Sequence, residues 1–259
     1  MIREIVQWFQ PVQIKGIVDL DDPSATQVHG EILQQKDFLK RLYTDFYNQL
    51  RDAVPGYQNK IIVELGSGCG FIKKVIPNAV TSDILDLPGV DMVFSAEQIP
   101  FEDRSVDAFV MIDVLHHIAD SSAFFSEAAR CLKPSGRIVM IEPANTAMAK
   151  FIYKNFHHED FDTRGTWGLE KQGPLSQGNG AIGWIIFNRD RKIFQQKFPD
   201  LKIVDIFNHT PFGYLLSGGF TLPQLLPGCC YPIIKIFEQI IQPANNLLGM
   251  FQTIKLQKA

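Results

Sequence analysis

The residues best suited to chemistry end a short apolar run within Ile61–Phe71. Gly66, Gly68 and Gly70 follow at alternate positions, and the acid Glu64 stands two residues before the first of them. Glycine has no Cβ, so a chain with this spacing can turn sharply and lie close to a ligand. The β-branched residues Ile61–Val63, a few positions before the glycines, indicate a buried parallel strand. The stretch therefore predicts a nucleotide-like cofactor at the end of a strand, with an ordinary glycine turn as the alternative.

The spacing of the glycines also separates the cofactors that such a loop can bind. A dinucleotide fingerprint needs a third glycine where Phe71 stands, and a P-loop needs a Gly-Lys-Ser or Gly-Lys-Thr sequence that does not follow. Asp83 ends the next run, 79–82, at about 20 residues further on, where a carboxylate can accept hydrogen bonds from ribose hydroxyls. These residues favour a ribose-containing cofactor and argue against NAD.

From this loop to Pro143 the chain resembles the class I S-adenosylmethionine (SAM)-dependent methyltransferases, in their small-molecule branch. The motifs that carry the resemblance stand in the family's order: Val63–Gly70, Ser82–Ile84, Ala96–Phe101, Ser105–Val110, Val114–Ile118 and Leu132–Arg137. Several motifs in one order are more specific than any one alone. The resemblance implies an α/β fold, with a Rossmann-like, mainly parallel seven-stranded sheet, helices on both faces and an antiparallel last strand. It also implies S-adenosyl-L-methionine as cofactor and methyltransferase activity.

The resemblance assigns a set of residues to the cofactor. Those expected to bind SAM are Glu64, Gly66, Ser67, Gly68, Gly70, Asp83, Ile84, Ala96, Glu97 and Ile112. The family commonly has an acid for the adenine amino group just before Ala96, and this chain has Ser95 there. The adenine contact therefore has three alternatives, which are Ser95, Glu97 and backbone groups.

The chemistry that the resemblance implies is attack of an acceptor oxygen, nitrogen or carbon on the sulfonium methyl group, with the two reactants held in line. A hydroxyl acceptor also needs a base. The end of the predicted strand at Asp113 is expected to border the methyl group. The candidate bases are His116, His157, His158 and Glu142, of which His116 and His157 are predicted to be catalytic. The predicted acceptor is a small molecule or a lipid- or sugar-linked group.

Hydrophobic periodicity predicts the elements that position these residues. Helices are expected over 26–51, as one long or two short helices, and over 71–76, 121–132, 146–156 and 184–198. Strands are expected over 61–65, 79–83, 90–94, 106–113, 137–141, 201–207 and 249–256. The helix at 71–76 should be short, because Pro77 stops it early, and should point its N-terminus at the SAM carboxylate. Asn188 is a candidate cap for the helix at 184–198. Five polar residues of the first helices either face the cofactor or lie solvated on packing helices: His29, Lys36, Arg41, Tyr43 and Tyr47.

A second group of chemically capable residues, His157-His158-Glu159-Asp160, begins a loop that runs to Gly183. The group is compatible with a surface turn, with an acceptor loop that carries a base, or with a metal site. No second ligand pair follows at zinc spacing, and the neighbouring side chains of His116 and His117 cannot easily converge on one ion. No metal site is therefore predicted.

The segment 210–248 separates the last two predicted strands, where the family usually has a short hairpin. It is unusually apolar for a surface connection, and prolines and charged residues interrupt it too often for a membrane span. We expect a lid over the acceptor, a homodimer contact or a helix in peripheral contact with a membrane. Simple packing on the sheet edge is the structural alternative.

Length and composition fit one domain. The chain has 259 residues, 46% of them apolar, a formal net charge of -3 and no basic cluster of the kind that binds nucleic acid. The predicted division is a helical cap at 1–57, a cofactor-binding core at 58–143 and an acceptor-side half at 144–259. The N-terminus lacks a signal-peptide pattern and the four cysteines form no C-x-x-C pair, which predicts a cytoplasmic protein. The alternative to an enzyme is a non-catalytic scaffold or regulatory protein that keeps the SAM-binding fold.

Overall fold

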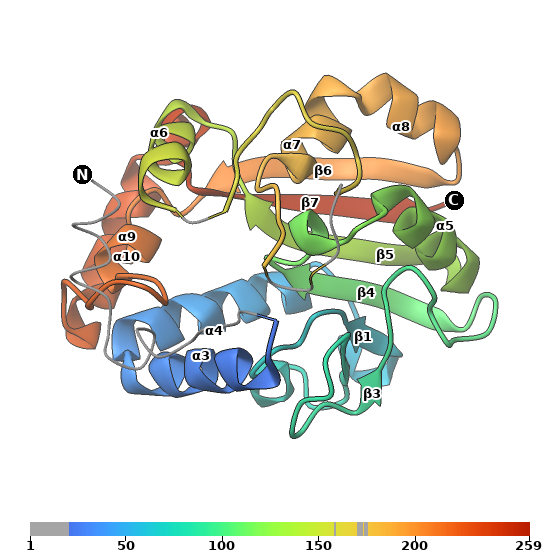
Figure 1. Cartoon of the computed structure of the whole chain (residues 1–259), viewed down its shortest axis with the longest axis horizontal. Coiled ribbons are helices and arrows are strands. Elements are labelled where there is room, and N and C mark those ends of the chain that lie inside the picture. The colour runs from blue at the N-terminus through green and yellow to red at the C-terminus, as the bar shows by residue number, and fades with distance from the viewer. Residues whose placement is uncertain (1–20, 158, 170–172, 174–175) are drawn as a thin grey trace.

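The computed structural model describes residues 21–157, 159–169, 173 and 176–259. A seven-stranded sheet in the order β3-β2-β1-β4-β5-β7-β6 forms its centre (Figure 1). The strands are Ile62–Glu64 (β1), Val80–Asp83 (β2), Met92–Val93 (β3), Val106–Ile112 (β4), Leu132–Pro143 (β5), Leu201–His209 (β6) and Phe251–Lys258 (β7). β7 runs antiparallel to both of its neighbours, whereas β1 to β5 pair in parallel. The predicted fold, with its antiparallel last strand, is confirmed.

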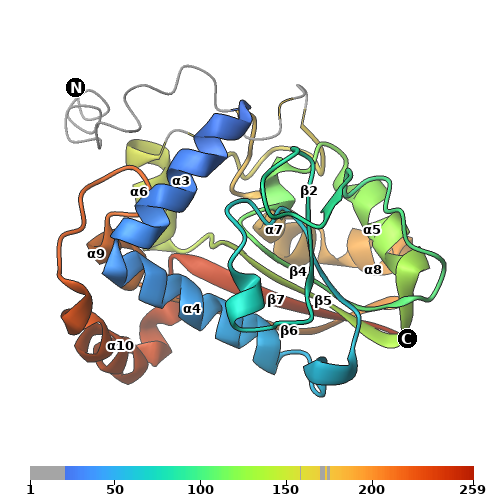
Figure 2. The same cartoon turned by 90° about the horizontal axis from the view of Figure 1, so that it is seen from below.

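Helices lie on both faces of this sheet, as predicted (Figure 2). Their bounds are Pro23–Gln35 (α3), Asp37–Asp52 (α4), Ser121–Cys131 (α5), Ala147–Phe156 (α6), Ile182–Trp184 (α7), Arg191–Lys197 (α8), Gly213–Ser217 (α9), Tyr231–Ile240 (α10) and Asn245–Leu248 (α11). Short 3-10 turns occupy Tyr57–Asn59, Ile72–Lys74, Leu115–His117, Gly228–Cys230 and Gln242–Ala244. Within the described part of the chain, no helix has both the length and the apolar character needed to cross a bilayer.

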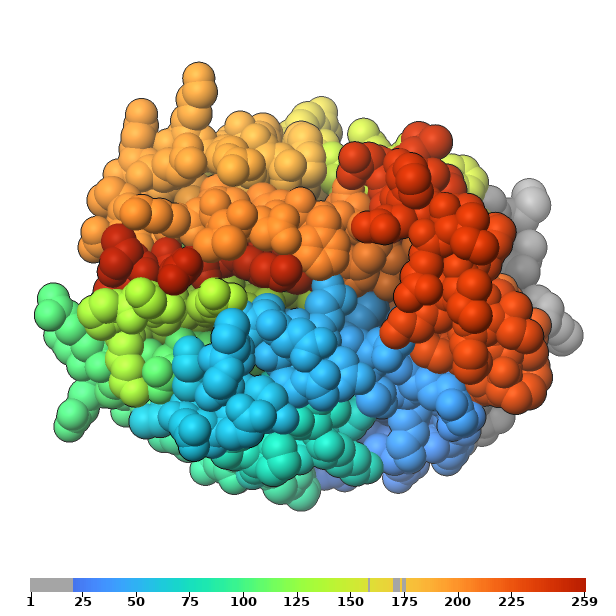
Figure 3. Space-filling view, turned by 180° about the vertical axis from the view of Figure 1, so that it is seen from behind, coloured from blue at the N-terminus to red at the C-terminus, as the bar shows by residue number. Residues whose placement is uncertain are grey.

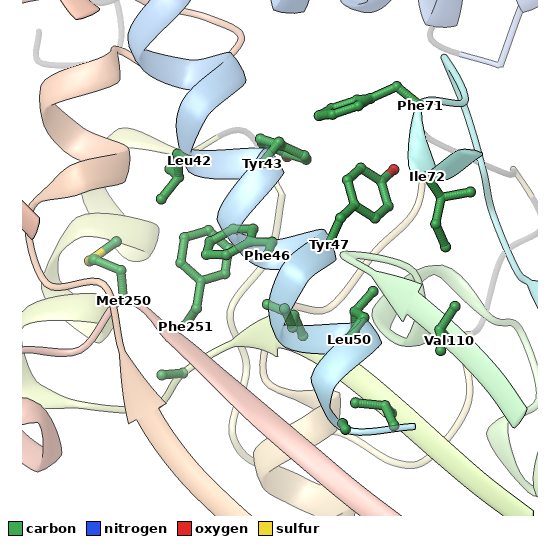
Figure 4. Packing of buried hydrophobic residues seen from close by; sticks show 14 of the residues in the cluster. Leu42, Tyr43, Phe46, Tyr47, Leu50, Phe71, Ile72, Val110, Met250 and Phe251 are labelled. Carbon is green, nitrogen blue, oxygen red and sulfur yellow. The ribbon is translucent and has the colours of Figure 1, made fainter. Parts of the chain in front are cut away.

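Each face of the sheet has its own core, because alternate side chains of a strand point to opposite faces. On one face, Val110 and Ile141 pack in a cluster with buried residues of α4, among them Phe46 (Figure 4). On the other face, Phe109 and Met140 pack in a cluster with buried residues of α5 and α8. Burial of one large apolar side chain contributes about 1.5–3 kcal/mol. The two cores therefore hold the central strands, and with them the strand ends on which the site is built.

The structure differs from the predicted helices at two places. Residues 71–76 form only a 3-10 turn, because Pro77 follows directly and cannot continue an α-helix. Asn188 caps no helix and lies exposed inside a π-helical turn, in which the N–H of Asp190 donates to the carbonyl of Ile185 at 2.8 Å. The wider turn delays the start of α8, so the position that the periodicity marks as a cap lies within a helical turn.

The apolar insertion at 210–248 packs beside the N-terminal helices, as the orange-red and blue surfaces in Figure 3 show. The ammonium group of Lys36, at the break between α3 and α4, donates to the carbonyls of Gly219, at 2.6 Å, and of Leu222. The hydroxyl of Tyr231 in α10 donates to Asp45 of α4 at 2.6 Å. The insertion and the helical cap thus form one wall. The outer side of α10 still exposes Ile233, Ile236, Phe237 and Ile240.

Candidate functional site

The loop after β1 bends at its three glycines, whose φ angles are +60° at Gly66, +53° at Gly68 and +47° at Gly70. Side chains rarely adopt this conformation, and a Cβ on Gly66 would stand 2.5 Å from the side chain of Val114. The N–H of Gly68 donates to Oδ2 of Asp83 at 2.9 Å, which ties the loop to the end of β2. The backbone therefore requires these glycines.

A cleft of about 650 Å³ lies over this loop and the carboxyl ends of β1, β2 and β4. Open α/β sheets bind their ligands at this edge. Of the residues predicted to bind the cofactor, those that line the cleft are Glu64, Gly66, Ser67, Gly68, Asp83, Ile84, Ala96, Glu97 and Ile112. Gly70 does not line it. Of the polar residues on the N-terminal helices, His29, Tyr43 and Tyr47 line the cleft, whereas Lys36 binds the insertion and Arg41 pairs with Asp37.

Glu64 lines the cleft with only 2% of its surface exposed, and burial raises the pKa of its carboxyl to about 7. Hydrogen bonds from Ser67 and Tyr47 oppose this rise. Its Oε2 atom has no hydrogen-bond partner within the described ranges. A buried polar atom without a partner is costly. This oxygen is therefore suited to a donor group or a positive charge on a ligand.

Asp83 has structural partners as well as a place in the cleft. Its Oδ2 accepts from the N–H of Gly68 at 2.9 Å, and its Oδ1 accepts from the N–H of Leu85 at 3.0 Å. Each carboxylate oxygen has a second lone pair. The residue can therefore order the glycine loop and accept hydrogen bonds from a ribose at the same time.

Two of the alternatives for the adenine contact, Ser95 and Glu97, lie together in the cleft. The hydroxyl oxygen of Ser95 accepts from the N–H of Glu97 at 3.2 Å. Oε1 of Glu97 accepts from the N–H of Asp120, the residue that caps α5, at 2.7 Å. A carboxylate is an acceptor for amino groups, so Glu97 offers the chemistry that the family's missing acid would supply.

A second group of polar side chains gathers beside the cleft from separate parts of the chain. His116 and His117 lie on the 3-10 turn after β4, Glu142 lies near the end of β5, and Glu159 follows α6. Nδ1 of His116 lies 2.6 Å from Oε2 of Glu142, and its Nε2 lies 3.2 Å from Oε2 of Glu159. Nε2 of His117 lies 3.5 Å from the other oxygen of Glu159, and its Nδ1 lies 2.8 Å from the carbonyl oxygen of Gln177.

Most of the candidate bases therefore meet in one cluster. Nδ1 of His157 lies 3.8 Å from Oε2 of Glu159, and Glu142 holds His116. His158 lies outside the described residues. Sequence reasoning did not identify Glu159 as the common partner of the histidines. The only signal for it was its place in the run of histidines and acids after the helix at 146–156.

Burial and neighbouring charges set the protonation of this cluster. Burial lowers the pKa of His116, but Glu142 and Glu159 together hold that pKa well above its ordinary value. Burial by itself would raise the pKa of Glu159, but the contact with His116 outweighs burial and lowers this pKa below its ordinary value. The carboxyl is therefore ionised. Burial lowers the pKa of His117, which favours its neutral form. At the end of β4, burial raises the pKa of Asp113 to about 8.

A smaller cavity of about 180 Å³ lies beside these side chains. Its polar lining includes Asp113, His116, His117, His157 and Glu159, and its aromatic lining includes Tyr43, Tyr153, Tyr214, Phe220 and Phe251. The residues that line both this cavity and the larger cleft are His29, Tyr43, Asp113, His117 and Phe220. The two spaces therefore adjoin where β4 ends.

The side chains of His116 and His117 lie closer together than the expectation that they cannot easily converge on one ion implies. Their ring centroids are 4.2 Å apart, and one Nδ1 is held by Glu142 and the other by the carbonyl of Gln177. These anchors turn both Nε2 atoms toward Glu159. Ligand atoms of His116, His117 and Glu159 lie within 4.8 Å of one another.

Comparisons with known proteins find relatives of the cofactor-binding half of the chain. The family model of the methyltransferase domain matches residues 65–140. Over 44 residues the chain is 43% identical to a demethylmenaquinone methyltransferase of Tropheryma whipplei (strain Twist), covering 17% of this chain and 18% of the relative. Over 62 residues it is 39% identical to a ubiquinone/menaquinone biosynthesis C-methyltransferase of Bartonella bacilliformis, covering 24% of each. The matched stretches thus span less than a quarter of the length of these curated relatives.

Similar solved structures cover more of the chain at lower identity. A putative S-adenosylmethionine dependent methyltransferase from Listeria monocytogenes has a TM-score of 0.49 at 12% identity, with 82% of this chain and 97% of that chain covered. A geranyl diphosphate C-methyltransferase from Streptomyces coelicolor A3(2) has a TM-score of 0.49 at 14% identity, with 85% and 78% covered. The family model of the methyltransferase domain matches residues 65–140, which confirms the resemblance to the class I SAM-dependent methyltransferases that their motifs indicated.

Proposed function

We propose that the chain transfers a methyl group from SAM to a small-molecule, lipid-linked or sugar-linked acceptor. The observation that carries the proposal is the junction of the two cavities at the end of β4, where Asp113 lines both and His116 lines the smaller one. Methyl transfer requires the two reactants to be held in line, and adjoining cavities provide a place for each of them.

The residues of the larger cleft fit SAM. When bound, SAM supplies an electrophilic methyl group on a positively charged sulfur. We expect Glu64 to hold a positively charged group through its unpaired oxygen, and Asp83 to accept hydrogen bonds from the ribose hydroxyls. The glycine loop leaves space that a side chain on Gly66 would fill. The expected helix at 71–76 is a 3-10 turn over Ile72–Lys74, so its contribution to holding the SAM carboxylate is smaller than that of a full α-helix N-terminus.

The smaller cavity supports an apolar or aromatic acceptor. Its aromatic wall provides stacking surface, and the first relative described above is named for a demethylmenaquinone. His116 and His157 are the proposed catalytic residues, because both line this cavity. His157 can accept a proton from an acceptor hydroxyl, whereas His116, which Glu142 and Glu159 hold protonated, places a positive charge beside the acceptor. Contact of the exposed side of α10 with a membrane surface or a second copy stays a prediction.

Calorimetric titration and a transfer assay test this proposal. We expect SAM and its demethylated product to bind and NAD not to bind. SAM with a labelled methyl group should label reduced quinones or phenols more than sugars. NAD binding without SAM binding would refute the assignment. SAM binding without turnover on a broad acceptor panel would instead support the non-catalytic scaffold.

A matched pair of histidine variants locates the transfer step. General-base catalysis contributes typically about 10²–10⁴-fold, so His157→Gln should lower turnover of a hydroxyl acceptor by at least about a hundredfold if His157 takes the proton. SAM affinity should stay unchanged, because His157 does not line the larger cleft. His209→Gln alters a histidine that lines neither cavity and should leave turnover unchanged. Equal turnover in both variants would exclude His157 as the base.

A further inference from the structure

We propose that His116, His117 and Glu159 form a binding site for one divalent transition-metal ion of the zinc class, with an open coordination position on the smaller cavity. The three side chains offer two imidazole nitrogens and a carboxylate within 4.8 Å of one another. All three line the smaller cavity. Two histidines and one glutamate, with the fourth position left for water or substrate, form a known ligand set of catalytic zinc sites.

The hydrogen bonds behind the rings prepare both imidazoles as ligands. Nδ1 of His117 lies 2.8 Å from the carbonyl oxygen of Gln177, which can only accept, so Nδ1 carries the proton and the neutral ring has its lone pair on Nε2. Nδ1 of His116 lies 2.6 Å from the carboxylate of Glu142, which likewise keeps a proton on Nδ1 and leaves Nε2 as the ligand atom once the ring gives up its second proton. A metal-bound histidine almost always donates its other ring N–H to a carboxylate, a backbone carbonyl or water. Here the carboxylate of Glu142 is the partner of His116, and the backbone carbonyl of Gln177 is the partner of His117.

The distances from Glu159 agree with a metal between the side chains. Two ligand atoms, each about 2.0–2.1 Å from a tetrahedral zinc ion, lie about 3.3 Å apart. Nε2 of His116 lies 3.2 Å from Oε2 of Glu159, and Nε2 of His117 lies 3.5 Å from Oε1. Oε2 of Glu142 lies 2.6 Å from Nδ1 of His116, so a second acid stands directly behind the ligand set and favours a cation there. Metal binding displaces any proton from the two Nε2 atoms.

The nature of the donors selects the metal. Mg²⁺ and Ca²⁺ bind oxygen ligands, whereas imidazole ligands suit zinc, copper, iron and nickel. The open position would hold an oxygen of the acceptor beside the SAM cleft, since His117 lines both spaces. This role, unlike the metal site itself, rests on the proposed function. His116 would then serve as a ligand, and proton uptake would fall to His157.

Titration of the full-length, chelator-treated chain with Zn²⁺ alone tests the site, without cofactor or acceptor. We expect one equivalent to bind and Co²⁺ to give the visible absorption of a tetrahedral nitrogen–oxygen site. His117→Gln and Glu159→Gln should each weaken Zn²⁺ binding by about 100-fold or more, and Glu142→Gln, behind His116, by about 10–100-fold. His157→Gln should bind Zn²⁺ like the wild type, because its side chain lies outside the ligand set.

Parallel SAM titrations of each variant separate a lost ligand from a lost fold. Absence of Zn²⁺ and Co²⁺ binding by the wild-type chain would overturn the proposal and leave the contacts as ion pairs of protonated His116 with Glu159. Wild-type Zn²⁺ affinity in the SAM-binding His117→Gln and Glu159→Gln variants would overturn it as well. Stoichiometric Zn²⁺ binding in a chain that does not bind SAM would support the site and refute only the proposed function.

Discussion

The protonation of Glu64 provides a test of the cofactor site that needs no acceptor. Burial raises the pKa of this carboxyl from 4.5 to about 7. A group whose pKa is higher in the folded chain than in the unfolded chain holds its proton more tightly when folded. The folded state therefore loses stability as the pH rises from the unfolded pKa through the folded one. Glu64→Gln keeps the shape of the side chain and removes its titration, so it should stabilise the cofactor-free protein at high pH and have little effect at low pH.

The size of this effect follows from the two pKa values of Glu64. The interval from 4.5 to about 7 corresponds to about 3 kcal/mol, because each pH unit is worth about 1.36 kcal/mol. The ionised wild-type chain should be less stable by about this amount near pH 8 than the chain with a protonated carboxyl. Roughly 2 kcal/mol of the loss should appear between about pH 5.5 and about pH 8.

Urea unfolding of the wild type and Glu64→Gln across this pH range measures the difference, provided that the slope against urea is the same in both. Glu127→Gln is a control of opposite sign, because the hydrogen bond from Arg130 lowers the pKa of Glu127, and its loss should destabilise the chain at high pH. A Glu64→Gln variant with no added stability near pH 8 would refute the assignment of a buried carboxyl whose pKa burial raises. The SAM affinity of Glu64→Gln should fall, although its stability rises. The variant should bind SAM at least about tenfold more weakly near pH 8, because a hydrogen bond to a charged group contributes about 1.5–3 kcal/mol.

Asp83→Ala should weaken SAM binding at least about tenfold, because hydrogen bonds of about 1.5–3 kcal/mol each are lost. The variant should also unfold at a lower urea concentration, because the N–H of Gly68 in the glycine loop loses its acceptor. An unchanged SAM affinity together with an unchanged urea midpoint would place the ribose elsewhere. Gly70→Ala should destabilise the fold by only about 1–2 kcal/mol of backbone strain, because the new Cβ would meet no other atom. Gly66→Ala should destabilise it more, because the new Cβ would also collide with the side chain of Val114. Equal urea midpoints of the two variants would contradict this order. Replacement of 217–242 by a Gly/Ser linker should abolish methyl transfer while SAM affinity falls only a few-fold, because Phe220 is the residue of that segment that lines the cofactor cleft. A folded variant that still transfers methyl groups at the wild-type rate would exclude the lid.

The cofactor half of the fold could be predicted because each signal is local and the signals agree. A β-branched run, a glycine loop and a carboxylate at the next strand end mark positions that the parallel sheet brings to one edge, as Glu64 and Asp83 show. The two differences from the predicted helices arose where local signals compete. Pro77 ends the helix at 71–76 too early, and the π-helical turn around Asn188 adds a residue that a 3.6-residue period does not contain.

The acceptor-side cluster could be predicted only in part, because its members come from segments far apart in sequence. His116 and His157 could be selected by residue type and position. Their shared contact with Glu159 depends on the path of the loop after α6, and periodicity does not determine the path of a loop. The convergence of His117 with His116 depends on two anchors, Glu142 and the carbonyl of Gln177, and neither is a neighbour in sequence.

The insertion contributes Phe220 to the walls of both cavities, so the expectation of a lid over the acceptor alone is too narrow. The ring of Phe220 lies 5.0 Å from that of His29 and 5.7 Å from that of Tyr43, measured between centroids, and all three line both spaces. The ammonium group of Lys36 donates hydrogen bonds to the carbonyls of Gly219 and Leu222, which stand before and after Phe220 in the sequence. A movement that admits an acceptor past Phe220 must therefore change its contacts with the helical cap. Exchange of acceptor and of cofactor should consequently be coupled through this one loop.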